Sequence, residues 1–271
     1  MATLMNMRVE RKRYLDHKID ISCIILSNLN DSFVKQRIIP SIIENSKSHS
    51  IEIIVVDNSS TQDFECNNVK VIHTEPYHIP KAYNKGVSIA KGKYIALFHD
   101  DCELLDDNWI DKFTSELNDD VYAVSPEIYN NTEGQFLKEV PLVMERKNFL
   151  DIGGYDETYY FGYEDVGLSH KIKDKGKNIK QVKINSKHYG GMSSILMYCD
   201  KDSENYYKKM FLEATDVGKI YQIHHKVMAN FWKALDIDYH DIGKISWKKL
   251  YKKMPKTRKE IKDLVYKLKN S

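Results

Sequence analysis

Three carboxylates stand close together in the run His99-Asp100-Asp101-Cys102-Glu103, directly after the apolar stretch Tyr94–Phe98. Carboxylates crowded at the end of a strand repel one another and are best tolerated beside a cation. Mg²⁺ and Mn²⁺ take oxygen ligands, typically one or two carboxylates together with substrate phosphates. The run therefore predicts the metal and phosphate site of a nucleotide-dependent transferase. The plainer alternative is a set of solvated acids near a helix start, since Asp106 and Asp107 follow closely.

Short, nearly continuous apolar runs predict strands that are buried on both faces of a sheet. In the first half of the chain they are Ile19–Leu26, Ile51–Asp57, Val69–His73, Tyr94–Phe98 and Val121–Ser125. The helices predicted between them are Ser32–Asn45, which Pro40 kinks or restarts, Pro80–Ala90 and Asp107–Leu117. This alternation predicts an α/β fold: a doubly wound, mostly parallel twisted sheet with flanking helices.

Polar residues follow three of these strands. They are Ser27-Asn28, Asp57-Asn58-Ser59-Ser60 and His99 to Glu103. Ligands of open α/β sheets bind outside the carboxyl ends of the strands. We therefore expect Ser27, Asn28, Asp57 and Asn58 to lie at the same ligand site as the acidic run.

The second half of the chain has a different pattern. A short helix is predicted at Glu145–Ile152, a helix from Glu164 to Lys175 and a strand at Ile179–Ile184. An aromatic stretch, Tyr155 to Tyr163, precedes the second helix, and the turn His188-Tyr189-Gly190-Gly191 follows the strand. From residue 200 the chain is predicted to be helical and increasingly basic. The expected organisation is an extension over 1–18, a catalytic domain over 19–199 and a helical, basic region over 200–271.

The composition is that of an ordinary globular protein, with 42% hydrophobic and 30% charged residues among 271. Its four cysteines form no CxxC pair, which indicates a reducing compartment without a structural zinc site. No stretch reaches the length of a membrane-spanning helix, and the first 18 residues lack the apolar segment of a secretory signal. The sequence therefore predicts a cytoplasmic protein.

Four segments, in order, resemble the family 2 glycosyltransferases of GT-A fold. They are VVDNSS (Val55–Ser60), IPKAYNKGVSIAKGKYIALFHDDCEL (Ile79–Leu104), GGYDETYYFGYEDVGLSHKIKDKG (Gly153–Gly176) and HYGGMSS (His188–Ser194). The resemblance covers roughly residues 19 to 194. It implies a metal-dependent, inverting enzyme that moves a sugar from a nucleotide-sugar, most simply a UDP-sugar, to a hydroxyl of a glycan or lipid-linked acceptor.

The resemblance also implies roles for single residues on the nucleotide side. Asp57 accepts a hydrogen bond from the base, a role for which a turn-forming aspartate is the alternative. Asn84 and Lys81 follow as donor-site candidates, with a structural amide and a surface lysine as their alternatives. Asp100 is expected at the ribose.

For the metal, the resemblance implies Mn²⁺ or Mg²⁺ held by Asp101, with Glu103 assisting through water. His99 stands where many members have Asp or Asn, which is a departure from the family pattern. His188 corresponds to a histidine that serves as a further metal ligand, and a structural histidine is the alternative. Cys102 is a poor match for Mg²⁺ and is expected to pack.

The pair Glu164-Asp165 opens a predicted helix, where acids are also favoured by the helix dipole. The resemblance implies that one of them is the general base that deprotonates the acceptor hydroxyl. We assign Asp165 as the base and Glu164 to acceptor binding. Gly167 replaces an acid that usually follows, which affects the expected acceptor contacts. Aromatic residues between Tyr155 and Tyr163 are expected to supply about two sugar-stacking rings.

The C-terminal segment from Gly243 carries eleven Lys or Arg against two acids. Ile261, Leu264, Val265 and Leu268 lie on one helix face. Two interpretations are open: a solvated helix that packs on the domain, or a peripheral contact with the anionic inner face of a membrane. Nucleic-acid binding is disfavoured because the charge is local and no recognition motif accompanies it.

Other functions on similar folds find less support. A nicotinamide dehydrogenase would need GxGxxG after the first strand, where the chain reads Ser27-Asn28-Leu29-Asn30. A sugar nucleotidyltransferase would need a glycine-rich loop at the same place. A catalytically inactive sugar-nucleotide-binding or scaffold protein remains the alternative.

Overall fold

The computed structural model describes residues 19–127, 137, 140–158, 164–199, 202–215, 217–238, 252–253, 255 and 257–269. The expected extension over 1–18 and the aromatic residues from Tyr159 to Tyr163 lie outside these residues, as does most of the segment between 239 and 256.

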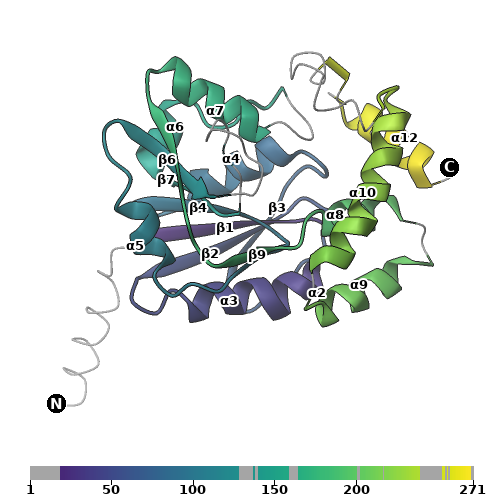
Figure 1. Ribbon diagram of the computed structural model, residues 1–271, viewed down its shortest axis with the longest axis horizontal. Coiled ribbons are helices and arrows are strands. Elements are labelled where there is room, and N and C mark those ends of the chain that lie inside the picture. Colours follow the sequence, from purple (N-terminus) through teal and green to yellow (C-terminus); the bar gives the residue numbers. More distant parts are fainter. Residues whose placement is uncertain are drawn as a thin grey trace, which may run out of the picture.

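A seven-stranded sheet forms the centre of the molecule, in the order β3-β2-β1-β4-β7-β6-β8 (Figure 1). Its strands are β1 (Ile21–Ser27), β2 (Ile51–Asp57), β3 (Lys70–His73), β4 (Tyr94–His99), β6 (Val121–Pro126), β7 (Leu142–Glu145) and β8 (Asn178–Val182). All seven residues of β1 are buried, as expected for a continuous apolar run in the middle of a sheet. The predicted strands of the first half are confirmed to within two residues at each end.

One strand of this sheet was not predicted. β7 lies between β4 and β6 and runs antiparallel to both, whereas β3, β2, β1 and β4 are mutually parallel. The prediction took Glu145 as the start of a helix, but Glu145 ends β7 and the helix α6 begins at Arg146. The sheet is therefore mixed and mostly parallel, which confirms the predicted fold class.

Helices cover both faces of the sheet because alternate residues of its buried strands point to opposite sides. Ile24, Ile54 and Leu97 belong to the apolar core beneath α4 and α7, whereas Cys23, Val55 and Phe98 belong to the core on the other side. The face that carries Ile24 is covered by α4 (Ile79–Ile89), α6 (Arg146–Asp151) and α7 (Glu164–Asp174). The opposite group comprises α2 (Asp31–Phe33), the π-helical η1 (Val34–Ile38), α3 (Ile39–Glu44) and α5 (Trp109–Thr114).

A small ribbon and a C-terminal group of helices complete the described structure. The ribbon pairs β5 (Cys102–Leu104) antiparallel with β9 (Ser186–His188). The helices are α8 (Met192–Tyr198), α9 (Glu204–Glu213), α10 (Val217–Ala234) and α12 (Arg258–Lys269), gathered at one end of the sheet (Figure 1). None of the described helices is long and apolar enough to cross a membrane.

Candidate functional site

The register of the sheet brings the three predicted strand ends together. Ser27 lies opposite Asp57, and Leu26 lies opposite His99. The residues that follow these strands therefore meet at one edge of the sheet, facing the start of α8. A cavity of about 180 Å³ lies there. Its walls include five of the predicted site residues, Asn28, Asn58, Asp100, Asp101 and Glu164, together with His99, Tyr77, Ser193 and Met197.

The two carboxylate oxygens of Asp101 have different surroundings. Oδ2 accepts hydrogen bonds from the backbone N–H groups of Gly191 at 2.7 Å and Met192 at 3.2 Å. Oδ1 is buried and accepts no hydrogen bond from the described residues, and it lies 3.3 Å from Nε2 of His188. Burial alone would raise the pKa of Asp101, but His188, His99 and the Met192 N–H together hold it well below its usual range. Asp101 is thus an ionised carboxylate whose Oδ2 is held by two backbone N–H groups and whose Oδ1 lies beside His188.

A candidate metal centre lies at Asp101. The ligand atoms of His99, Asp101 and His188 all lie within 4.8 Å of one another. Three protein donors with room for further ligands suit a divalent cation that also binds a substrate oxygen. The residues present therefore fit the Mn²⁺ or Mg²⁺ that the sequence predicted, and His99 lies beside Asp101 and His188 in this group.

Asp100 connects the end of β1 to α8. Its Oδ2 accepts hydrogen bonds from the backbone N–H of Asn28 at 2.9 Å and from the Ser193 hydroxyl. Its backbone oxygen accepts a further bond from Nδ2 of Asn30 at 3.0 Å. Burial, followed by the negative charge of Asp101, raises the pKa of Asp100. The side chain lines the cavity and belongs to the wall that α8 closes.

Asp57 does not line the cavity. Its carboxylate accepts hydrogen bonds from the N–H groups of Ser59 at 2.9 Å and Phe64 at 3.2 Å, and Nδ1 of His73 lies 3.2 Å away. The alternative of a turn-forming aspartate describes this geometry. The neighbouring Asn58 faces the cavity instead, with its Oδ1 buried and accepting no hydrogen bond from the described residues.

Three other predicted donor-site residues lie outside the cavity walls. The Ser27 hydroxyl is buried and donates to Oδ1 of Asp31 at 3.4 Å. Lys81 is half exposed and pairs with Glu75, with 3.1 Å between Nζ and Oε2. Asn84 ties α4 to the loop after α6, since it donates to the Tyr155 oxygen at 3.0 Å and accepts from the Tyr155 N–H at 2.9 Å. Lys81 and Asn84 thus have partners within the chain, and their donor-site roles stay predictions.

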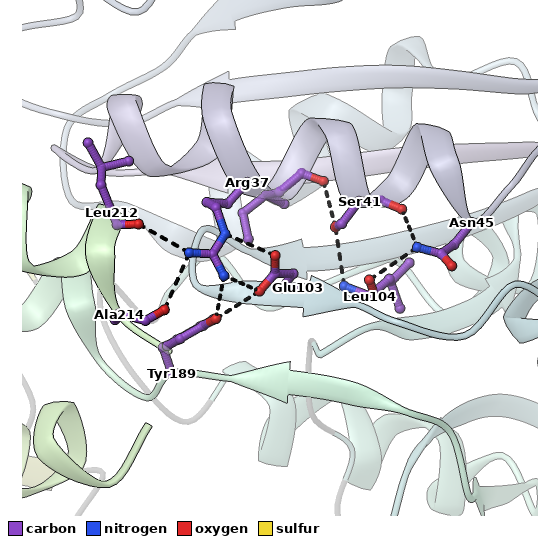
Figure 2. Close-up of polar contacts among 9 residues, drawn as sticks. Arg37, Ser41, Asn45, Glu103, Leu104, Tyr189, Leu212 and Ala214 are labelled. Atoms are coloured by element: carbon purple, nitrogen blue, oxygen red, sulfur yellow. Dashed lines mark hydrogen bonds and ion pairs between the residues drawn. The ribbon is translucent and has the colours of Figure 1, made fainter. Parts of the chain in front are cut away.

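Glu103 has close partners on other segments of the chain. Arg37 donates to both of its oxygens, Nε to Oε1 at 3.0 Å and NH2 to Oε2 at 2.7 Å, and the Tyr189 hydroxyl donates to Oε2 at 2.7 Å (Figure 2). Burial raises the pKa of Glu103, but these donors outweigh it and the net pKa is lowered. Glu103 is not a member of the metal-capable group among the described residues. Its three hydrogen bonds connect the ribbon to η1, and its support of the metal through water stays a prediction.

Figure 2 also shows how Arg37 gathers four segments. Its Nε and Nη2 contact Glu103 on β5, and Nη2 also contacts Tyr189 after β9. Its Nη1 donates to the backbone oxygens of Leu212 at 3.2 Å and Ala214 at 3.3 Å, at the end of α9. His188 directly precedes Tyr189, and Asp101 directly precedes Cys102, the first residue of β5. Arg37 of η1 therefore fixes the ribbon that positions the candidate metal centre.

The acidic pair at the start of α7 approaches the cavity unequally. Glu164 lines it, whereas Asp165 is buried behind it, with Oδ1 accepting the Val166 N–H at 2.7 Å. Among the aromatic residues predicted to stack on sugar, Tyr155 is a core residue, packed against Tyr83 and Phe149. Tyr159, Tyr160, Phe161 and Tyr163 fall outside the described residues.

Fold and site together define a class: an α/β protein of GT-A type whose strand ends supply a cavity and a cation-binding group. The sequence pattern of "Glycosyl transferase family 2" matches residues 23–172, which is more than half of the chain. The chain therefore belongs to glycosyl transferase family 2.

Two solved structures support the fold. One is the mannosyltransferase PcManGT from Pyrobaculum calidifontis in complex with GDP-Man and Mn²⁺, with 11% identity, TM-score 0.51, and coverage of 83% of this chain and 76% of the other. The other is GalNAc-T7 with UDP, GalNAc and Mn²⁺, with 12% identity, TM-score 0.51, and coverage of 89% and 59%.

A third similar structure is the catalytic domain of Drosophila β1,4-galactosyltransferase 7 in complex with xylobiose, with 17% identity, TM-score 0.47, and coverage of 60% of this chain and 64% of the other. The chain thus spans less than two thirds of this structure and of GalNAc-T7. A search of the curated proteins found no match.

Sequence reasoning missed several residues of the site. Tyr77, in the loop after β3, and Ser193, at the start of α8, both line the cavity. Ser193 lies in the HYGGMSS segment, so the resemblance had marked its surroundings. Tyr77 has a positive φ of 66°, and its backbone N–H donates to the backbone oxygen of Asn58 at 2.9 Å. No local pattern in the sequence signals that conformation.

Proposed function

We propose that this protein is a metal-dependent, inverting glycosyltransferase that uses a nucleotide-sugar, with a UDP-sugar as the first choice, and a hydroxyl of a glycan or glycoconjugate as acceptor. The observation that carries the proposal is the cavity at the ends of β1, β2 and β4, in which Asp100, Asp101 and Glu164 meet beside His99 and His188. The family to which the chain belongs supports it.

The nucleoside side of the donor is assigned to the asparagines. Asn28 and Asn58 each present a buried amide oxygen that accepts no hydrogen bond from the described residues. Leaving such acceptors unmatched costs free energy, so a ligand that donates N–H or O–H groups is favoured there. The N3–H of uracil and the ribose hydroxyls are donors of this kind. Asp57 then acts indirectly, because it folds the loop that presents Asn58.

The phosphate side is assigned to the candidate metal centre. Asp101 and His188 would hold the cation, and the bound cation would neutralise the charge that the leaving nucleoside diphosphate gathers. Gly191 and Met192 orient Asp101 through Oδ2, which leaves Oδ1 beside His188 as the proposed ligand atom. Asp100, fixed by Asn28 and Ser193, supplies the wall against which the ribose lies.

The acceptor side is assigned to the start of α7. Asp165 removes the proton of the acceptor hydroxyl as that oxygen attacks C1 of the donor sugar, and one such displacement inverts the anomeric centre. Glu164 contacts the sugar from the cavity wall. Because Glu164 is the member of the pair that lines the cavity, it is the alternative base, and kinetics separate the two roles.

The test begins with thermal unfolding in the presence of nucleotides and nucleotide-sugars, with and without Mn²⁺. A ligand that binds only the folded state raises the apparent stability, and we expect UDP to do so more strongly with Mn²⁺. Release of UDP from the best donor is then measured for Asp165→Asn and Glu164→Gln. Loss of the base should lower kcat by about 10²–10⁴-fold, while loss of a sugar contact should mainly raise KM.

Two results would contradict this assignment. If Asp165→Asn kept its kcat and Glu164→Gln lost it, the base would be Glu164. If no nucleotide-sugar shifted the unfolding temperature and none was turned over, the protein would be a non-catalytic member of the fold.

A further inference from the structure

The donor set of the candidate metal centre is unusual in its chemistry. Two of its three members, His99 and His188, offer imidazole nitrogens, and only Asp101 offers a carboxylate oxygen. The other acid of the run that points at the cavity, Asp100, is tied to Asn28 and Ser193, and Glu103 is tied to Arg37 and Tyr189. The remaining acids therefore do not restore an all-oxygen site.

The positions of the three donors support a shared ion. His188 Nε2 and Asp101 Oδ1 lie 3.3 Å apart, close to the spacing of about 3 Å expected for two neighbouring ligands that each lie about 2.1 Å from one cation. The ring centroids of His99 and His188 lie 6.1 Å apart with the rings nearly perpendicular. Asp101 Oδ1 is buried, without a hydrogen bond from the described residues, and lies within 4.8 Å of a ring nitrogen of each histidine.

We propose that His99 is a direct metal ligand beside Asp101 and His188, and that this two-imidazole, one-carboxylate set makes the site select first-row transition ions such as Mn²⁺ over Mg²⁺. The proposal rests on the proposed function, because it concerns the cation that serves the same site. It adds a residue, His99, and a selectivity to that function.

The selectivity follows from ligand chemistry. Mg²⁺ is a hard ion that prefers oxygen ligands and loses its water reluctantly, so each oxygen ligand replaced by imidazole weakens its binding. Imidazole nitrogen suits the first-row transition ions, with affinity rising from Mn²⁺ toward Co²⁺ and Zn²⁺. A second imidazole in place of a carboxylate should therefore widen the difference between the affinities of the site for Mn²⁺ and for Mg²⁺.

The first test measures metal binding directly, without turnover. Mn²⁺ and Mg²⁺ are titrated calorimetrically into the metal-free protein, into His99→Asn and into the control His49→Asn, whose histidine pairs with Asp111 away from the cavity. We expect His99→Asn to weaken Mn²⁺ by about tenfold or more, because even outer-shell partners of a metal are worth roughly 10–100-fold. His49→Asn should leave both affinities unchanged. His99→Asp should instead narrow the preference for Mn²⁺ over Mg²⁺.

The second test identifies the nitrogen atoms that bind the Mn²⁺ ion. Pulsed electron paramagnetic resonance of the Mn²⁺-loaded protein should show nitrogen modulation from two imidazoles, and from one in His99→Asn. If His99→Asn kept the Mn²⁺ affinity and the two-nitrogen signal, His99 would not be a ligand. The proposal would equally fail if the variant lost UDP affinity alone, since His99 would then contact the phosphates.

Failure of this inference is distinguishable from failure of the proposed function. Unchanged metal binding in His99→Asn, together with Mn²⁺-dependent binding of UDP, would overturn the ligand role and leave the glycosyltransferase proposal intact. Absence of any binding of Mn²⁺ and of nucleotides to the unaltered protein would overturn both.

Discussion

Asp101 illustrates how one carboxylate is prepared for a cation by its surroundings. The N–H groups of Gly191 and Met192 hold Oδ2, which leaves Oδ1 facing the two imidazoles. Gly191 can present its N–H there because its φ is +82°, a conformation that favours glycine. A Cβ atom at this position would also meet Cδ2 of the His224 ring at 2.1 Å. The local backbone is thus part of the site.

A pair of glycine substitutions separates the cost of the positive φ from the cost of the clash with the His224 ring. Gly153 has a φ of +74°, but a Cβ atom there would meet nothing within 4 Å, so Gly153→Ala should cost only the backbone contribution of about 1–2 kcal/mol. Gly191→Ala should cost more, because the His224 ring must also move, and it should weaken Mn²⁺ binding. Urea unfolding and Mn²⁺ titration of both variants measure this. If both variants were destabilised equally and both bound Mn²⁺ as before, the backbone at Gly191 would not be part of the site.

At the scale of elements, the β5–β9 ribbon carries the candidate metal centre and Arg37 of η1 holds the ribbon. The Arg37 and Glu103 side chains are 24% and 12% exposed, so their ion pair is largely shielded from water. Breaking a buried pair by removing one partner leaves an uncompensated charge, which is more costly than losing an exposed pair. The ribbon therefore depends on a long-range contact rather than on its own three-residue strands.

Arg37→Met should lower the free energy of unfolding by about 3 kcal/mol at pH 7. The control Lys47→Met removes an exposed pair with Glu44 and should change it by no more than about 0.5 kcal/mol. Because the folded pKa of Glu103 is lowered, the pair stabilises fully above the unfolded pKa of about 4.3 and is lost as the pH falls through the folded value. Urea unfolding between pH 7 and 3 should show the Arg37→Met deficit shrinking below about pH 4, and a constant deficit would contradict this.

At the scale of the whole molecule, the C-terminal helices join the catalytic region through a shared apolar cluster. Ile261 and Leu264 of α12 are buried with Phe231 and Trp232 of α10, and Met197 of α8 connects this cluster to the cavity wall. Val265 and Leu268 pack against the same cluster. The apolar face that was one candidate for lipid contact is thus used for packing, as the other interpretation expected.

A matched pair of charge insertions tests that packing. Ile261→Asp buries a carboxylate and should destabilise the protein by about 3 kcal/mol or more, whereas Lys262→Asp on the exposed side should have little effect on stability. Urea unfolding followed by tryptophan fluorescence measures both. If Ile261→Asp instead left stability unchanged and abolished binding to phosphatidylserine vesicles, the face would serve a membrane.

The local sequence was sufficient for the elements that a single segment can specify. The continuous β-branched runs of β1, β2 and β4 determine buried strands, and the polar residues after them determine which edge of the sheet binds ligand. These features depend on neighbours in the chain, which is why composition and period reveal them. The roles expected of the acids at the start of α7 and of Asp101 came instead from the resemblance to family 2 glycosyltransferases.

The tertiary structure alone decided which candidates meet. His188 joins His99 and Asp101 because β5 pairs with β9, which places His188 across from Cys102, 86 positions away in the chain. Arg37, from η1, binds both oxygens of Glu103, a partner that no local pattern in the sequence indicates. The antiparallel β7 is likewise defined by its neighbours β4 and β6 rather than by its own four residues. The sequence determined the chemical groups at the strand ends, and long-range pairing determined their partners, because a side chain's hydrogen bonds and charges depend on what folding places beside it.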